Sequence, residues 1–145
     1  VGPIHVVGTR AQCAMADIGA TMEKAFSEAK QQVTAAGMNC QSTAVTVYHK
    51  VDLKRETFDF TSGFTVPELK TADNLSTWSL PACQAFAVGH RGSYNHLGNA
   101  WSAAYQHVRY KKLKLGTQGT FEMYRNDPQE VDPAELLTDI YLPVR

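Results

Sequence analysis

The chain has 145 residues, a length that suits one domain with its own hydrophobic core. Lys plus Arg and Asp plus Glu number 14 each, and this zero formal charge argues against a nucleic-acid-binding surface, which usually carries a basic excess. The 3 cysteines have no CxxC spacing, which predicts reduced thiols and a cytoplasmic location. No apolar run approaches the ~20 residues of a membrane span, so we expect no membrane contact.

The first half of the chain predicts a strand, a helix and two more strands. The opening strand covers Ile4–Met15. Apolar side chains then recur at steps of three and four from Ile18 to Ala36, with Asp17 as a candidate N-cap and Gly37 as a C-terminal stop. Two strands with alternating or apolar character complete this half, at Ala44–Val51 and Phe58–Val66.

The second half predicts the same order of elements after a linking segment, Leu69–Pro81, which has room for a short strand of its own. A helical stripe runs from Leu97 to Val108, with Asn95 as a candidate cap and Gly116 beyond its end. The strands of this half are Cys83–Arg91, Gly119–Arg125 and Thr138–Val144.

The two halves align with each other. A shift of 79 residues places Met22 on Trp101, and after a deletion of three residues Tyr48 falls on Tyr124. We therefore predict one domain, 1–145, made of two pseudo-repeats at about 1–68 and 76–145. The predicted fold is α+β: two strand-helix-strand-strand units form one antiparallel sheet, with both helices on one face and a ligand cleft between them.

One acid, Glu122, stands among apolar and aromatic residues of a predicted strand. It shares a strand face with Tyr124, while Phe121 and Met123 share the other face. A carboxylate beside aromatic rings suits an apolar, planar or cationic ligand, because each cation–π contact adds about 0.5–2 kcal/mol. Partial burial would also raise its pKa and suit proton transfer. A solvent-facing position and an internal ion pair are the alternatives.

A turn joins a predicted strand to the second helix in the segment His90–Gly98. Gly92 permits the turn, and Tyr94 would project its hydroxyl near the start of the helix. The five histidines have no metal-binding spacing, and no GxSxG, Walker or GxGxxG motif is present, so we expect no metal and no cofactor. Haem remains a minor hypothesis, with His90 or His96 as its axial ligand.

Three stretches of the second half have a characteristic order and spacing: His90–Tyr94 followed by Leu97 and Trp101, Phe121–Pro128, and Leu136–Val144. With these stretches and the first helix, nearly the whole sequence resembles the GyrI-like small-molecule-binding domain. That domain is related to the effector-binding domains of AraC- and MerR-type bacterial transcription regulators.

The resemblance implies that Glu122 is the acid of a ligand cleft bordered by Tyr94, Trp101 and Tyr124. We expect four further aromatic residues among the ligand-binding set: Tyr48, Phe64, Tyr105 and Tyr141. The implied ligand is an apolar or cationic, drug-like molecule. The implied role is a bacterial sensor, regulator or toxin-sequestering module that is fused to another domain or interacts with one, with no nucleic-acid contact through this domain.

The resemblance also implies an alternative from a different class, because some members hydrolyse cyclopropane-bearing genotoxic compounds. In that case Glu122 would be the catalytic acid/base and Tyr94 would assist it. The residues alone leave open whether the protein catalyses a reaction.

Overall fold

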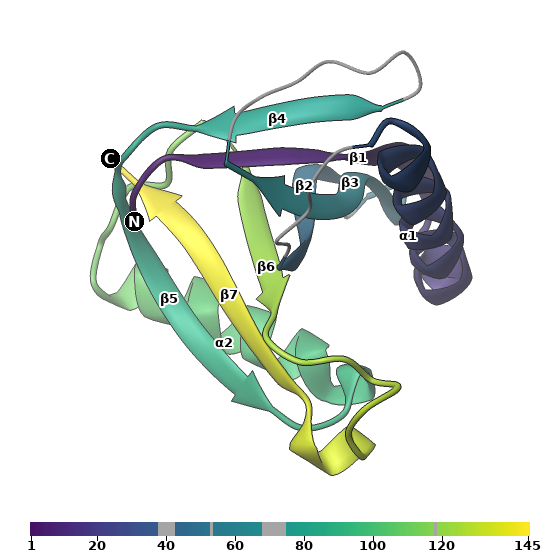
Figure 1. Ribbon diagram of the computed structural model, residues 1–145. Coiled ribbons are helices and arrows are strands. Elements are labelled where there is room, and N and C mark those ends of the chain that lie inside the picture. Colours follow the sequence, from purple (N-terminus) through teal and green to yellow (C-terminus); the bar gives the residue numbers. More distant parts are fainter. Residues whose placement is uncertain (38–42, 53, 68–74, 118) are drawn as a thin grey trace.

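A computed structural model describes residues 1–37, 43–52, 54–67, 75–117 and 119–145 (Figure 1). Its strands are β1 (Ile4–Ala14), β2 (Ala44–Asp52), β3 (Thr57–Val66), β4 (Ser76–Leu80), β5 (Gln84–Arg91), β6 (Thr120–Tyr124) and β7 (Leu137–Val144). Its helices are α1 (Ile18–Ala35) and α2 (Leu97–Tyr110), and short 3-10 turns form η1 (Met15–Asp17), η2 (Tyr94–His96) and η3 (Pro133–Glu135).

All seven of these strands form one antiparallel sheet in the order β4-β1-β3-β2-β6-β7-β5. Helix α1 packs on β1 and β3, and α2 packs on β5 and β7 (Figure 1). Apart from the edge strand β4, each half therefore contributes a strand, a helix and two strands, and β2 meets β6 at the centre. The predicted α+β class, with one antiparallel sheet and two helices, is confirmed.

Apolar side chains pack on both faces of the sheet. On the helix-covered face there are two buried clusters. One joins α2 to β7 and contains Ala104, Val108, Ile140 and Leu142. The other joins α1 to β1 and β3 and contains Val7, Val33 and Val66. On the opposite face, the buried cluster contains Val6, Val45, Val47, Leu80 and Phe121. This division follows from strand alternation, since neighbouring residues such as Val6 and Val7 point to opposite faces.

Two glycines allow β1 and β3 to approach closely. Gly8 lies opposite Gly63, and an added Cβ at Gly63 would lie 2.0 Å from the Val7 carbonyl oxygen. At Gly8 the corresponding distance to the Ser62 oxygen would be 2.3 Å. Any other residue would push the strands apart, so this pair permits the strong twist by which β1 and β4 run across the direction of β5 and β7 (Figure 1).

The predicted strand ends are correct to within one residue. The linking segment contains β4, while its residues 69–74 lie outside the described residues. Gly37, with φ of 67°, ends α1 as predicted. Asp17 occupies the N-cap of α1 without a side-chain hydrogen bond to the helix. The cap predicted at Asn95 is wrong, because the chain first forms η2 and α2 begins after His96.

Neither helix of the described residues is long and apolar enough to cross a membrane.

Candidate functional site

Glu122 lies at the centre of the sheet, on the face that the helices cover. It is directly opposite Thr46, where β6 pairs with β2. The same cross-strand row continues on one side to Ile140 and on the other to Ser62. Glu122 is 1% exposed, and the side chains of Thr46 and Ser62 are fully buried. A carboxylate and two hydroxyls therefore occupy the middle of an otherwise apolar layer.

Three uncharged donors hold the two carboxylate oxygens of Glu122. The hydroxyls of Tyr48 and Tyr124 donate to Oε1 at 2.8 and 2.6 Å. The indole N–H of Trp101, from α2, donates to Oε2 at 2.8 Å. Among the described residues, no ion pair includes Glu122. Glu122 is therefore neither solvent-facing nor part of an internal ion pair, contrary to both alternatives considered from the sequence.

Burial raises the pKa of the Glu122 carboxyl, and the hydrogen bonds from Tyr124, Trp101 and Tyr48 oppose that rise. Burial and the nearby carboxyl also raise the pKa of Tyr48 and Tyr124 well above the ordinary tyrosine value. Both phenols therefore keep their protons at neutral pH and act as donors to the carboxylate.

Aromatic rings enclose the carboxylate from the α2 side. The ring of Trp101 meets Tyr48 edge-on at a centroid distance of 5.4 Å. Tyr105, one turn further along α2, stacks on Trp101 at 6.0 Å and is 37% exposed. Tyr48 and Trp101 thus pack next to Glu122, and Tyr105 extends the row of rings to solvent.

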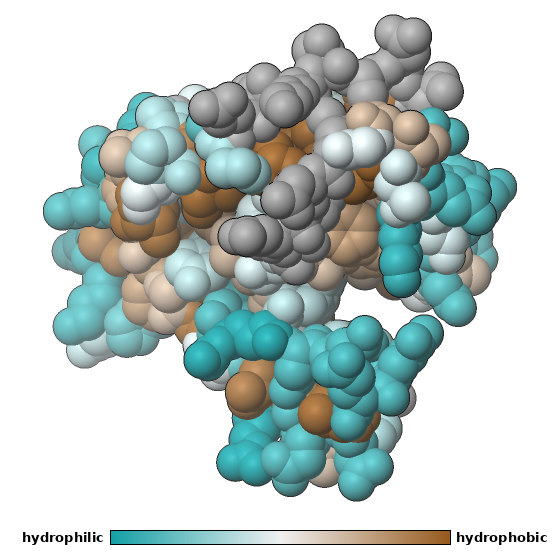
Figure 2. Space-filling view, in the orientation of Figure 1, coloured by the Kyte–Doolittle hydropathy of each residue, from teal (hydrophilic) through white to brown (hydrophobic). Residues whose placement is uncertain are grey.

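A second set of rings surrounds Tyr124 between α1 and η2. Phe26 of α1 packs edge-on against Tyr124 at 5.7 Å, and Tyr94 of η2 does so at 5.6 Å. Tyr94 is 37% exposed. Figure 2 shows the molecule hollowed between α1 and the end that carries η2 and η3. Tyr124 thus contacts both α1 and η2 while its hydroxyl donates to the buried carboxylate.

Three side chains on the α1 side that were not among the predicted site residues, Thr46, Ser62 and Met22, also adjoin Tyr124 or its partners. The hydroxyl of Thr46 lies 2.9 Å from Ser62 Oγ and 3.0 Å from the Tyr124 hydroxyl. Met22 of α1 places its Sδ 3.4 Å from the same Tyr124 hydroxyl. From the sequence, Met22 was only part of the apolar stripe of the first helix, and no role was predicted for Thr46 or Ser62. The available signal was the internal repeat, in which Met22 aligns with Trp101.

Most of the predicted site residues come together, with two exceptions. Phe64 lies further from Glu122, because its ring packs on Phe26, at a centroid distance of 6.2 Å, and Phe26 in turn packs on Tyr124. Tyr141 lies on the opposite face of the sheet, stacked on Phe121 at 4.9 Å. Its neighbour Ile140 faces the helices, so alternation turns Tyr141 away, and the expectation that it shares a cleft with Glu122 is corrected.

Within the described residues, no group of three or more His, Cys, Asp or Glu side chains is arranged to hold a metal ion. His90, one of the two histidines considered for haem, lies near the end of β5, with Nε2 3.2 Å from the Ser93 carbonyl oxygen.

Two surface hollows lie away from Glu122. One, of about 540 Å³, follows the outer face of α1 and is lined by Ser27, Lys30, Gln31, Thr34 and Ala35. The other, of about 460 Å³, lies where the β2–β3 hairpin meets the end of β1, and Asp59 is among its lining residues.

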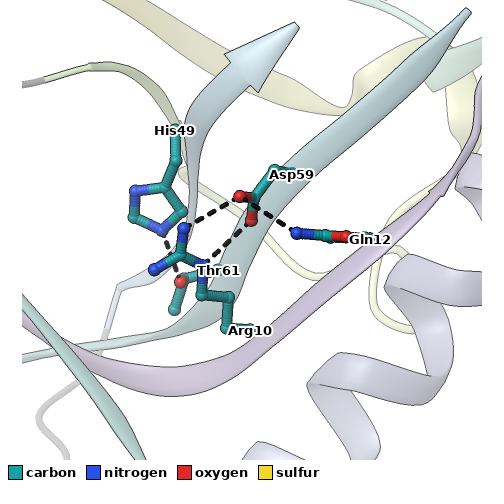
Figure 3. A network of polar contacts seen from close by, with 5 residues as sticks. All are labelled: Arg10, Gln12, His49, Asp59 and Thr61. Atoms are coloured by element: carbon teal, nitrogen blue, oxygen red, sulfur yellow. Dashed lines mark hydrogen bonds and ion pairs between the residues drawn. The ribbon is translucent and has the colours of Figure 1, made fainter. Parts of the chain in front are cut away.

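The second hollow adjoins the carboxylate of Asp59, whose environment differs from that of Glu122. Figure 3 shows the guanidinium of Arg10 facing Asp59, with two hydrogen bonds of 2.9 and 2.8 Å. Gln12 also donates to this carboxylate, at 3.4 Å. The hydrogen bond from Arg10 lowers the pKa of Asp59. Asp59 thus has a cationic partner of its own, whereas the hydrogen-bond partners of Glu122 among the described residues are all neutral.

Comparison with known proteins agrees with this architecture. A family model described as a GyrI-like small molecule binding domain matches residues 1–145. The fold is similar to that of the EcmrR C-terminal domain, with a TM-score of 0.85, 24% identity, and coverage of 100% of this chain and 93% of that chain. No curated protein sequence matches the chain.

Two more distant structures share the fold. SAV2435, whose structure is described as bound to tetraphenylphosphonium, matches with a TM-score of 0.70, 11% identity, and coverage of 100% of this chain and 90% of that one. A hydrolase from Listeria innocua matches with a TM-score of 0.60, 13% identity, and coverage of 100% and 89%.

Proposed function

Because the chain belongs to the GyrI-like small-molecule-binding domain family, we propose that it binds an apolar organic cation beside Glu122. The observation that carries this proposal is the carboxylate itself, which is buried, held by three neutral donors, and unpaired with any cation among the described residues. The aromatic side chains around it would form the walls of the site.

A buried negative charge is costly unless it is paired and hydrogen-bonded. The donors of Tyr48, Tyr124 and Trp101 satisfy the lone pairs of Glu122 without neutralising its charge. A cationic ligand would supply the missing positive charge inside an environment of low dielectric constant. By contrast, Asp59 already has Arg10, so it offers no such attraction.

The exposed aromatic rings suggest how such a ligand would enter. Tyr94 covers the Tyr124 ring from η2 and remains partly exposed. A flat or globular apolar cation that displaces Tyr94 would meet the Tyr124 ring and, behind it, the carboxylate. Cation–π contacts with several rings would add to the charge attraction.

We further propose that the domain acts as the effector-sensing module of a bacterial cytoplasmic regulator. This role is supported by the fold it shares with the C-terminal domain of EcmrR and with SAV2435 bound to tetraphenylphosphonium. In this role, any contact with nucleic acid would come from a partner domain.

A pair of ions with the same shape and opposite charge tests the proposal. We expect isothermal titration calorimetry to show binding of tetraphenylphosphonium and much weaker binding of tetraphenylborate. Glu122→Gln should weaken tetraphenylphosphonium binding by about 1–3 kcal/mol, since a charge-assisted contact is lost. Glu130→Gln, which removes an exposed carboxylate of the same size, is the matched control and should leave the affinity unchanged. Equal binding of both ions, or an unchanged affinity in Glu122→Gln, would reject the proposal.

A hydrolase acting on electrophilic cyclopropane compounds is the second candidate. It is favoured by the raised pKa of the Glu122 carboxyl, which suits general acid catalysis, and by the fold shared with a hydrolase. Mass spectrometry of such compounds incubated with catalytic amounts of protein should then show product from many turnovers, which Glu122→Gln abolishes. Binding in stoichiometric amounts without product would exclude this candidate for the compounds used.

A further inference from the structure

Thr138 of β7 carries a buried hydroxyl for which the described residues supply no hydrogen-bond partner. Its side chain is fully buried, and Oγ1 makes no hydrogen bond with the described residues. A buried polar group without a partner destabilises a protein, whereas a valine of almost the same shape would avoid that cost. Its presence therefore calls for a role in another state of the protein, such as a complex with a ligand.

The register of the sheet places Thr138 in the same site as Glu122. Thr138 lies directly opposite Tyr124, on the face covered by the helices. Glu122 lies opposite Ile140, which makes Thr138 its diagonal neighbour across β6 and β7, at a separation of about 7–8 Å between backbones. The Tyr94 ring rests on Tyr124 beside this position. A ligand that replaces Tyr94 would thus have both Glu122 and the Thr138 hydroxyl within reach.

We propose that Thr138 Oγ1 is a second recognition point of the site, and that the preferred ligand is an apolar cation carrying a neutral hydrogen-bonding group. This inference rests on the proposed function. The group would be a hydroxyl, ether or carbonyl, because a second charge would have to be buried opposite an uncharged threonine. The cation pairs with Glu122, and the neutral group fills the unused hydrogen-bonding capacity of Thr138.

Two phosphonium ions of nearly equal size test this inference. Butyltriphenylphosphonium and (3-hydroxypropyl)triphenylphosphonium differ only by a methyl group in place of a hydroxyl. We expect calorimetry to show about fivefold tighter binding of the hydroxylated ion to the wild-type protein, the scale of one net hydrogen bond. Thr138→Val should remove this preference without weakening the binding of the butyl ion. Thr77→Val, at an exposed position of β4, is the matched control and should retain the preference.

The outcomes separate this inference from the proposed function. If neither ion binds, the proposed function fails and this inference fails with it. If both ions bind but Thr138→Val leaves their affinity ratio unchanged, only this inference is overturned. Thr138→Val should also keep or raise the urea midpoint of unfolding, because no internal hydrogen bond is lost. A clear fall in that midpoint would mean that the hydroxyl has a structural partner, which would likewise overturn the inference.

Discussion

The proposed chemistry of the site depends on a single residue, Glu122, which has no ion-pair partner among the described residues. Glu122 receives hydrogen bonds from Tyr48, Tyr124 and Trp101, and each of these favours its charged form. Burial favours the neutral form more strongly, so the pKa of the folded protein lies above the ordinary value of 4.5. The buried charge of Glu122 is therefore unfavourable by itself, which is why we propose that a cation binds beside it.

The raised pKa of Glu122 predicts how the free energy of unfolding depends on pH. Because the pKa of Glu122 is higher in the folded protein, the folded state retains a proton that the unfolded chain has released. The contribution of Glu122 is therefore fully present below pH 4.5 and is lost as the pH rises through the folded pKa. Urea unfolding of the wild type and Glu122→Gln across this range measures the effect.

The difference between these two proteins isolates Glu122 from other carboxyls. The pKa of Asp59 is lowered by Arg10, so its contribution has the opposite sign, but it is common to both proteins. We expect the wild type to lose stability relative to Glu122→Gln as the pH increases. A constant difference across the whole range would show that burial does not perturb Glu122.

At the scale of elements, β1 and β3 approach each other closely where Gly8 lies opposite Gly63. We expect Gly63→Ala to destabilise the protein severely, because its Cβ would lie 2.0 Å from the Val7 carbonyl oxygen. Gly19→Ala is the matched control. It places the same methyl group on α1, where nothing lies within 4 Å, and should stabilise the helix by roughly 0.5–1 kcal/mol. Denaturant unfolding measures both, and equal tolerance of the two changes would contradict this account.

Periodicity predicted the elements well, because helices and strands are local patterns. It placed Glu122 and Tyr124 on one strand face and located both helices. The cap of α2 was misplaced because η2 precedes the helix. The register irregularity between Tyr48 and Lys50, beside one donor to Glu122, left no recognisable mark in the sequence. Bulges of this kind redirect side chains near functional sites.

The composition of the site was only partly predictable, because it depends on which distant segments meet. The aromatic residues could be named from the family resemblance, but their contacts could not. Nothing local indicated that Trp101 donates to Glu122 or that Thr46 lies opposite it. Tyr141 was misassigned because the choice between two strand faces depends on the pairing with β6.

At the scale of the whole molecule, the site lies where the two halves meet. The pairing of β2 with β6 is symmetric about Thr46 and Glu122, since Ala44 lies opposite Tyr124 and Tyr48 lies opposite Thr120. The two central residues thus occupy equivalent positions in the two halves, one bearing a hydroxyl and the other a carboxylate. The exact boundaries of the pseudo-repeats remain a prediction from the sequence.

This asymmetry fits the proposal that a symmetric arrangement of strands binds a single cation. Only one half supplies a charge at the centre, while the other supplies Thr46, Ser62 and the sulfur of Met22. A second carboxylate at the Thr46 position would place two like charges in a buried site. The proposed site thus has one negative group, Glu122, and its proposed entrance is the recess between α1 and η2.

The most direct test of the central claim is the affinity for tetraphenylphosphonium measured by calorimetry from acidic to neutral pH. The account predicts that wild-type affinity rises with pH as Glu122 ionises, because the cation pairs with the charged form. In Glu122→Gln the affinity should be weaker and independent of pH. A wild-type affinity that stays constant through this range, or a pH profile that the glutamine variant reproduces, would contradict the account.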